Sequence, residues 1–446
     1  MSIAGQAGTA APTAIFQAGD GRERNSPHAG SCFSCRLSAS RKEKTMKTGK
    51  SFMRFTSRLK DLRNCMAWGM LAPAICMLML GVSAIAQQPK QPTITTIDAP
   101  HAGTISGYGT EAIAICPAGQ ITGLYADYSR AMHAYVRTTD GKITTFDAPG
   151  TGYAGAPIPF PVSGASAGTY AVAGDACGMV TGYSIDFRNV AHSYLRAPDG
   201  TFTMFDVPGA GTGPGQGTFA GNMSMSGELI AGYYVDATGM SHGFLRAGDG
   251  TITAFDVPAA AKGPGLGTTT FWAQCVNSAG AVTGSYFDQN GAAHGFVRAP
   301  DGTITTFDAP GAGTGSGLGT YTWAINPAGT TAGASQDNNG VYHGLLRTAD
   351  GKITLFDIKG AGTGAGQGTQ AEGINPSGVV TGYYTDANNV SHGYVRAVDG
   401  TLTFFDVPAA GTGSGQGTFP MTNNPLGAIV GYYVDNNGVY HGFVRQ

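Results

Sequence analysis

Histidine and aspartate, two side chains able to bind ligands and move protons, recur at a fixed spacing along most of this 446-residue chain. The histidine opens a phrase whose commonest form is His-Gly-Phe-Val-Arg, and it occurs at His133, His192, His242, His294, His343, His392 and His441. Each of the first six is followed 14 residues later by an Asp of the series Asp98, Asp147, Asp206, Asp256, Asp308, Asp357 and Asp406. These pairs could form a ligand site repeated seven times or a repeated scaffold hydrogen bond. An active site is a single constellation, and buried polar groups need partners, so we expect the scaffold role.

Acidic residues outside the repeat are the candidates for catalysis. Residues 87–446 hold 24 Asp and Glu, and 20 of them fall into three repeated series: the one above, the Asp-Gly turns from Asp140 to Asp399, and Asp127, Asp186, Asp236, Asp288, Asp337, Asp386 and Asp435. The four that remain are Glu111, Asp175, Glu228 and Glu372. This set is too small for a convincing active site, so we expect no catalytic residues. The alternative is a secreted hydrolase or lyase, acting on a polysaccharide or similar polymer, in which these four acids gather.

Three motifs resemble cofactor or metal sites, and each has a simpler explanation. Gly-rich stretches such as Gly209–Gly213 lack the helix and the Walker lysine of phosphate loops, and they read as connections between repeats. The turns Asp288–Gly291 and Asp435–Gly438 offer oxygen ligands for calcium, but Asp, Asn and Gly are ordinary turn residues. Cys32 and Cys35 have the spacing of half a zinc site, and no second pair follows. We therefore expect no cofactor and no metal.

The first 86 residues differ in composition from the rest and read as a leader. They hold 12 Lys and Arg against 4 Asp and Glu, whereas residues 87–446 hold 14 against 24. Within 46–86 a basic flank precedes an apolar run that ends in Ala84-Ile85-Ala86, the layout of a secretory signal peptide. An uncleaved anchor is the alternative, because the run is long enough to span a bilayer. We expect 1–45 to be disordered or untranslated, and the body to be secreted, periplasmic or extracellular.

The body is acidic and poor in cysteine. It lacks the basic stripe that nucleic-acid binding requires, so we expect no nucleic-acid partner. After signal cleavage we expect a monomer with no stable membrane insertion. Only Cys116, Cys177 and Cys275 remain in the body, so disulfides do not staple it.

The repeat predicts an all-β fold. The unit from Gln370 to Gly417 reads as four short antiparallel strands, with Asp399-Gly400 in a tight turn of the primed type before the last one. Seven units of about 50 residues predict a seven-bladed β-propeller over 87–446. The body begins with a lone fourth strand at 93–98 and ends with a third strand at 441–445. We therefore expect the two chain ends to pair and close the ring, which leaves no long exposed edge.

The His-(Gly/Ala)-(Phe/Tyr) core, as in His133-Ala134-Tyr135 and His441-Gly442-Phe443, together with the Asp-Gly hairpin, resembles the extracellular repeats called the HAF family. The resemblance covers nearly all of 93–446. It implies an exported, β-rich protein and no particular activity.

One strand varies between otherwise similar units. When the units are aligned on the turn that follows this strand, the first position of the strand holds Glu111, Tyr170, Phe219, Trp272, Tyr321, Gln370 and Phe419 in the seven units. First strands of propeller blades line the central channel, so we predict that a ligand contacts Tyr170, Phe219, Trp272, Tyr321 and Phe419. The alternative is that these aromatic rings pack between blades. The sequence thus favours an extracellular binding or scaffold module for a glycan, a peptide or an envelope polymer, and it does not indicate which.

Overall fold

The computed structural model describes residues 92–152, 167–270 and 274–446, and in these ranges it contains β-strands and no helix. No helix in this part of the chain could therefore span a membrane. The expected leader at 1–45, the signal peptide at 46–86, the boundary at Gln87 and Trp272 lie outside the described residues.

The strands fall into four groups that recur along the chain. The first strands all begin with Gly-Thr: β2 (Gly109–Ile115), β6 (Gly168–Gly174), β10 (Gly217–Met223), β14 (Gly267–Thr269), β18 (Gly319–Ile325), β22 (Gly368–Ile374) and β26 (Gly417–Asn423). The second strands are β3 (Ile121–Ala126), β7 (Val180–Ile185), β11 (Leu229–Val235), β15 (Val282–Phe287), β19 (Thr331–Gln336), β23 (Val380–Thr385) and β27 (Ile429–Val434). The third strands, which carry the His phrase, are β4 (Met132–Arg137), β8 (Ala191–Arg196), β12 (Ser241–Ala247), β16 (Ala293–Arg298), β20 (Tyr342–Arg347), β24 (Ser391–Arg396) and β28 (Tyr440–Arg445). The outer strands are β5 (Ile143–Phe146), β9 (Phe202–Phe205), β13 (Ile252–Phe255), β17 (Ile304–Phe307), β21 (Ile353–Phe356), β25 (Leu402–Phe405) and β1 (Ile94–Ile97).

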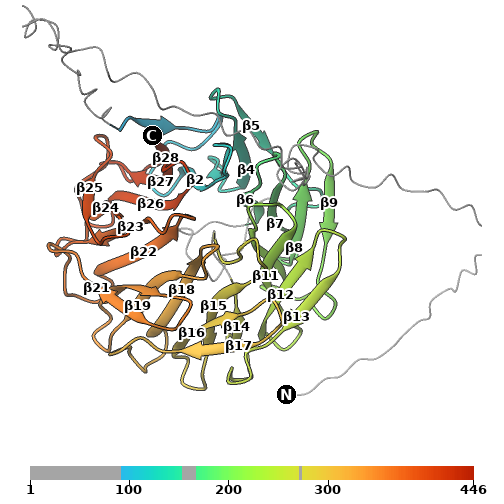
Figure 1. Ribbon diagram of the computed structural model, residues 1–446. Helices are drawn as coiled ribbons and strands as arrows, with labels where there is room; N and C mark the ends of the chain where they lie inside the picture. The colour runs from blue at the N-terminus through green and yellow to red at the C-terminus, as the bar shows by residue number, and fades with distance from the viewer. Residues whose placement is uncertain (1–91, 153–166, 271–273) are drawn as a thin grey trace, which may run out of the picture. The chain divides into compact units, whose positions relative to one another are not determined.

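Antiparallel pairing joins each first strand to the second, third and outer strand that belong with it, as in β2 with β3, β3 with β4 and β4 with β5. We number these strand sets along the chain, from set 1 (β2 to β5) to set 7 (β26 to β28 with β1). Each first strand begins beside the third strand of the preceding set, and β2 contacts both β6 and β26. The sets therefore form a closed, propeller-like ring of repeated strands (Figure 1).

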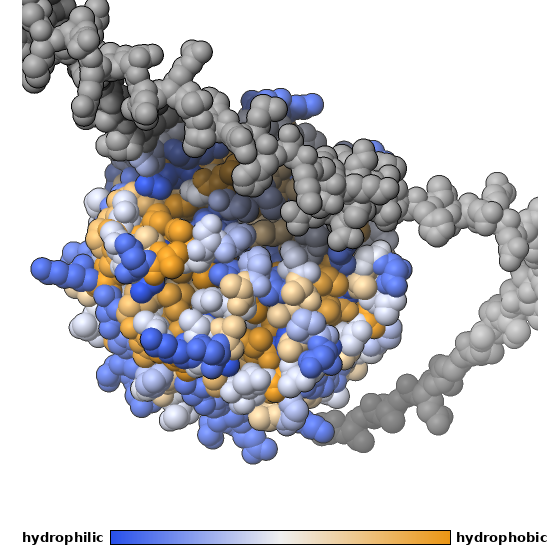
Figure 2. Space-filling view, viewed as in Figure 1, coloured by the Kyte–Doolittle hydropathy of each residue, from blue (hydrophilic) through white to orange (hydrophobic). Residues whose placement is uncertain are grey.

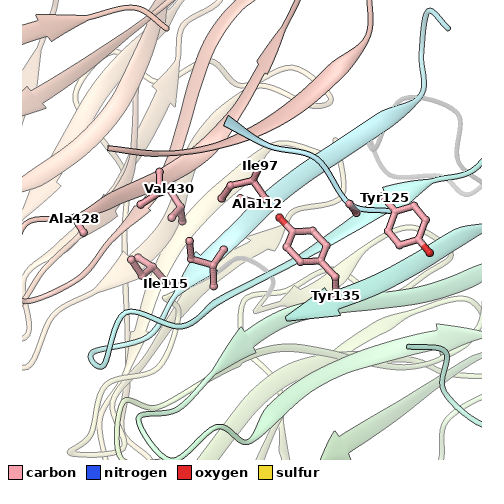
Figure 3. Close-up of a cluster of buried hydrophobic side chains, with 10 residues drawn as sticks. Ile97, Ala112, Ile115, Tyr125, Tyr135, Ala428 and Val430 are labelled. Atoms are coloured by element: carbon pink, nitrogen blue, oxygen red, sulfur yellow. The ribbon is translucent and has the colours of Figure 1, made fainter. Parts of the chain in front are cut away.

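The two ends of the body close the ring by pairing. Ile94 lies opposite Arg445 and Ile97 opposite Gly442 in the β1–β28 ladder. A hydrophobic cluster unites this pair with set 1, because Ile97 of β1 and Val430 of β27 pack with Ala112 of β2 (Figure 3). The predicted closure is confirmed.

A glycine and a threonine at the start of every first strand fix the joint between neighbouring sets. A Cβ on any of the seven glycines would lie within 3.0 Å of a carbonyl oxygen in the preceding third strand, as at Gly368 beside Tyr342. The next residue is a fully buried threonine, whose Oγ1 accepts a hydrogen bond of 2.9–3.0 Å from a backbone N–H just after the preceding outer strand. In set 6, Thr369 accepts from Ile358 in this way.

The Asp-Gly hairpins are tight, but they are not primed turns. In set 6 the N–H of Gly400 donates to the carbonyl oxygen of Ala397, and Gly400 has φ 90°. Asp399 does not have a positive φ. A type I′ turn needs positive φ at both of its central residues. The loop is instead a type I turn followed by a left-handed glycine, which adds a G1 bulge.

Removing β1 should open the ring. Deleting residues 1–100 would leave β28 with an unpaired edge and would remove Ile97 from the core, so we expect a lower melting temperature and aggregation. Deleting only 1–91 keeps β1 and is the matched control. Thermal unfolding with light scattering measures both, and equal melting of the two deletions would disprove closure by β1.

Two neighbouring glycines separate backbone strain from crowding. Gly366 has φ 79° and no atom within 4 Å of the position that a Cβ would take, whereas Gly368 has φ 113° and meets Tyr342. We expect Gly366→Ala to cost about 1 kcal/mol of stability through left-handed strain. Gly368→Ala should cost at least about 2 kcal/mol more, because its methyl overlaps the preceding set. Denaturant unfolding measures both, and similar losses would show that the close approach is not what limits this position.

Candidate functional site

The strand directions place the charges unequally on the two faces of the ring. First strands begin, and second and outer strands end, on what we call the connection face; the Asp-Gly turns lie on the opposite, hairpin face. The Asp series that follows the outer strands and the series that follows the second strands therefore both lie on the connection face, 14 residues in all. The described turns and connections of this face hold four Lys or Arg. On the face seen in Figure 2, hydrophilic residues project around the rim and hydrophobic ones gather nearer the centre.

Each repeated histidine is held between two aspartates. Its Nδ1 lies 2.7–2.9 Å from the Asp that ends the outer strand, and its Nε2 lies 3.4–3.8 Å from the Asp of the turn before it. In five sets a tyrosine also stacks on the imidazole ring, at 4.8–5.0 Å between centroids. Hydrogen bonds to Asp147 and Asp98 raise the pKa of His133 and His441. The predicted His–Asp hydrogen bond is confirmed in all seven sets, and both ring nitrogens have carboxylate neighbours.

The turn aspartates use their oxygens to hold the turn itself. Oδ1 of Asp288 accepts from the N–H groups of Asn290 and Ala292, and Oδ1 of Asp435 accepts from those of Asn437 and Val439. This is the hydrogen-bond pattern of an Asx turn. The geometry favours turn chemistry over calcium ligation at both turns.

The arginine that ends each third strand is also part of the scaffold in six sets. Its guanidinium lies 4.5–5.1 Å from the ring centroid of a phenylalanine in the preceding outer strand, as Arg396 does over Phe356. This cation–π contact packs one set against the next. The repeated His, Asp and Arg residues are thus accounted for by packing and hydrogen bonding.

Three of the five predicted aromatic residues, Tyr170, Phe219 and Phe419, pack against rings of the same or a neighbouring set, and the first two are buried. Tyr170 is 1% exposed and Phe219 is 6% exposed. Tyr170 stacks on Tyr183 at 4.7 Å, Phe219 stacks on Tyr233 at 4.8 Å, and Tyr183 meets Phe219 edge-on. These four rings form a continuous buried arc through sets 2 and 3, the arrangement that the packing alternative anticipated.

Register, rather than distance from the next turn, identifies the equivalent residue in set 4. Tyr170 pairs with Tyr183, and the residue in the same position of set 4 is Thr269, which pairs with Ser285. Gly267 and Gly280 are separated by 13 residues where the other sets have 10, so three residues are inserted within this strand. Alignment on the following turn had therefore assigned Trp272 to this column in error.

Sets 6 and 7 form a groove on the connection face. It has a volume of about 360 Å³ and is lined by Ala365, Gly366, Thr385, Asn389, Ser391, Gly415, Phe419, Tyr432, Val434 and Tyr440. Phe419 is the one predicted residue that lines it. Tyr321, in the same column of set 5, is partly exposed and donates from its hydroxyl to the Gly317 carbonyl. The sequence prediction missed Tyr432 and Tyr440 because they lie on second and third strands, whereas only the first strand was compared between units.

The four acids outside the repeat do not gather at one place. Oδ1 of Asp175 accepts from the N–H groups of Cys177 and Met179 in a turn, and Glu228 is exposed in another turn. Glu111 and Glu372 lie instead on first strands, where loss of hydration raises the pKa of each to about 8. Both carboxyls also contribute to the raised pKa of Tyr432, whose main cause is burial.

Gln274, which follows the insertion in set 4, contacts the ends of three other first strands near the hairpin face. Gln274 accepts from Ile374 N–H through Oε1 (2.8 Å), donates from Nε2 to the Asn423 carbonyl (3.1 Å) and accepts from Ile325 N–H through its own carbonyl (2.9 Å). The cavity beside it has a volume of about 40 Å³. This space has room for a very few waters and none for a sugar or peptide unit.

Replacing Glu111 should change how stability depends on pH. An acid whose pKa is raised on folding binds its proton more tightly in the folded state, so stability falls as pH rises from 4.5 toward 8. Glu111→Gln removes this loss, and Gln370 occupies the same position in set 6. We expect no gain in melting temperature at pH 4 and a gain of about 2 °C or more at pH 8. Glu228→Gln, in an exposed turn, is the control, and a pH-independent effect of Glu111→Gln would contradict the assignment.

No protein-family model and no curated protein sequence matches the chain. Among solved structures, it is similar to the BP39L lectin from Burkholderia pseudomallei at 10% identity and TM-score 0.44, over 74% of this chain and 96% of the lectin. It is also similar to TolB from Acinetobacter baumannii at 10% identity and TM-score 0.35, over 80% of each chain. The Aleuria aurantia lectin gives 12% identity and TM-score 0.31, over 78% of this chain and 96% of the lectin. At these identities and scores the similarities identify no family for the chain.

Proposed function

We propose that residues 87–446 are an exported, seven-bladed β-propeller of HAF-type repeats that acts as a binding module, with the groove between sets 6 and 7 as its ligand site. Each strand set is then one four-stranded blade, and set 7 is completed by β1. Export is supported by the basic flank, apolar run and Ala84-Ile85-Ala86 of the leader. N-terminal sequencing of the exported chain tests the boundary at Gln87.

The groove itself carries the proposal. Its volume of about 360 Å³ is within the range of small-molecule sites, which combine aromatic walls with a few polar groups. Phe419 and Tyr432 stack at 4.9 Å, and Tyr440 lies 5.6 Å from Tyr432, so three rings form one wall. Asn389 supplies an amide, and the hydroxyls of Thr385 and Ser391, which lie 3.2 Å apart and hydrogen-bond to each other, keep further donor and acceptor capacity. The groove therefore offers both apolar contact and hydrogen bonding to one ligand.

A binding role is favoured over catalysis by what the charged residues do. The repeated His, Asp and Arg side chains are engaged within the scaffold, and two of the four acids outside the repeat lie in turns. A hydrolase or lyase is the second candidate, because Glu111 and Glu372 have pKa values of about 8 and a protonated carboxyl can act as a general acid. Loss of a hydrolytic activity in Glu111→Gln or Glu372→Gln, with binding retained, would favour the enzyme.

Truncating the groove wall should weaken binding without loss of fold. We expect Phe419→Ala and Tyr432→Ala each to reduce affinity for a ligand found in a glycan, peptide and envelope-polymer screen by about 2 kcal/mol, the usual cost of removing an anchoring aromatic ring. Tyr321→Ala is the matched control, since it removes a ring from the same column outside the groove. His294→Ala should lower the melting temperature and leave affinity unchanged.

Titration calorimetry and thermal unfolding of the purified chain measure both effects. Affinity that is indifferent to Phe419 and Tyr432 but lost in a folded His294→Ala variant would transfer the site from the groove to the repeated histidines.

A further inference from the structure

We propose that the groove between sets 6 and 7 takes an uncharged saccharide segment, and we rest this on the proposal that the groove is the ligand site. The inference depends on three features of the groove: the absence of charge in its lining, the charge that surrounds it, and an amide at its edge.

The lining of the groove carries no charged side chain. Its ten residues are three aromatics, one valine, one alanine, two glycines, and the uncharged polar residues Thr385, Asn389 and Ser391. The polar residues come from the end of β23, the turn after it and the start of β24, so they lie along one side. The aromatic rings come from β26, β27 and β28 in set 7. A sugar ring has a matching division, with C–H groups on its faces and hydroxyl groups at its edge.

The connection face on which the groove opens is acidic, with 14 Asp of the two series against four Lys or Arg in its described turns and connections, which disfavours a polyanion. His392 is held by Asp386 and Asp406, and His441 by Asp435 and Asp98, at 2.7–2.9 Å for Nδ1 and 3.7–3.8 Å for Nε2. Ser391 and Tyr440 of the lining directly precede these two histidines in the chain. A sulfated or uronic acid polymer would bring like charges toward this acidic face, and this repulsion is unfavourable.

Two of these carboxylates, Asp386 and Asp435, are already engaged within their own turns. Oδ1 of Asp386 accepts from Asn388 N–H and Val390 N–H, and Asp435 is held by Asn437 and Val439 in the same way. Binding an ammonium group would have to compete with these bonds and with the histidines. An uncharged ligand avoids both the repulsion and this competition.

Asn389 gives the groove a polar edge that can be removed without disturbing the turn. Its Oδ1 accepts from Gln367 Nε2 at 2.9 Å, so its amide nitrogen is the group that we expect to donate to a ligand such as a sugar hydroxyl. Asn389 has φ 61°, and four equivalent turns have glycine at this position, with φ 75–84° at Gly239, Gly291, Gly340 and Gly438. Asn389→Gly therefore deletes the amide in a backbone conformation that glycine adopts readily.

Pairs of saccharides that share a backbone and differ in charge test the inference on the full chain. The probes are three pairs that share a backbone: N-acetylated and deacetylated chito-oligosaccharides, methyl-esterified and de-esterified galacturonans, and dextran and dextran sulfate. We expect binding to at least one neutral member, at least tenfold tighter than to its charged counterpart, and an affinity that is unchanged between 50 and 500 mM NaCl because no ion pairs form. Phe419→Ala should lower this affinity at least tenfold and Asn389→Gly severalfold, whereas Tyr321→Ala should not.

Each of the other outcomes would refute a different part of the proposal. Groove-dependent binding that is confined to the anionic or the cationic members would refute the uncharged ligand and leave the groove as the binding site. Binding that survives Phe419→Ala, Tyr432→Ala and Asn389→Gly alike would refute both proposals. Failure of every neutral member to bind would refute the saccharide assignment, and groove-dependent peptide binding would then identify the other ligand class. Asn389→Gly keeps the test valid if Phe419→Ala does not fold.

Discussion

The joint between neighbouring strand sets is the constraint on which the rest of the ring depends. A glycine at the start of each first strand allows that strand to approach the preceding third strand more closely than any Cβ permits. The threonine beside it then receives a backbone N–H from just after the preceding outer strand, in a fully buried hydrogen bond. Because leaving a buried donor unpaired is costly, this bond fixes where each outer strand ends. It also places the Asp just before the donor within reach of its histidine.

This constraint explains why the abundant His and Asp residues are poor candidates for chemistry. Each Asp next to the joint holds a histidine, and the turn Asp holds the other side of that ring while it caps its own turn. The same arrangement occurs across the chain ends between His441 and Asp98. A residue pattern that suggests acid–base chemistry in the sequence is therefore a means of orienting third strands and turns. Function has to come from positions where the sets differ.

The sets differ most around the ring interior, and the differences divide it into unlike sectors. In sets 2 and 3 Tyr170 and Phe219 are buried among rings, whereas in sets 6 and 7 Phe419, although it meets Tyr383 edge-on in the same way, lines an open groove with Tyr432 and Tyr440. The insertion in set 4 brings Gln274 into contact with sets 5, 6 and 7 near the hairpin face. The smaller cavity lies beside that side chain, and the larger space opens on the connection face. The repeated scaffold thus presents a groove of ligand size where sets 6 and 7 meet.

The sequence by itself determined the repeat, its strands, the pairing of the chain ends and the His–Asp hydrogen bonds, because each of these depends on local pattern or on a spacing fixed by one hairpin. It did not determine the turn type at Asp399-Gly400, since both kinds of hairpin use the same residues. Only the tertiary structure decided that Thr269 takes the column position assigned to Trp272, because an insertion is located by strand register. It also decided that Tyr170 and Phe219 are buried while Phe419 lines a groove with Tyr432 and Tyr440. Exposure of a ring depends on side chains from neighbouring sets, and those neighbours are brought together only when the ring closes.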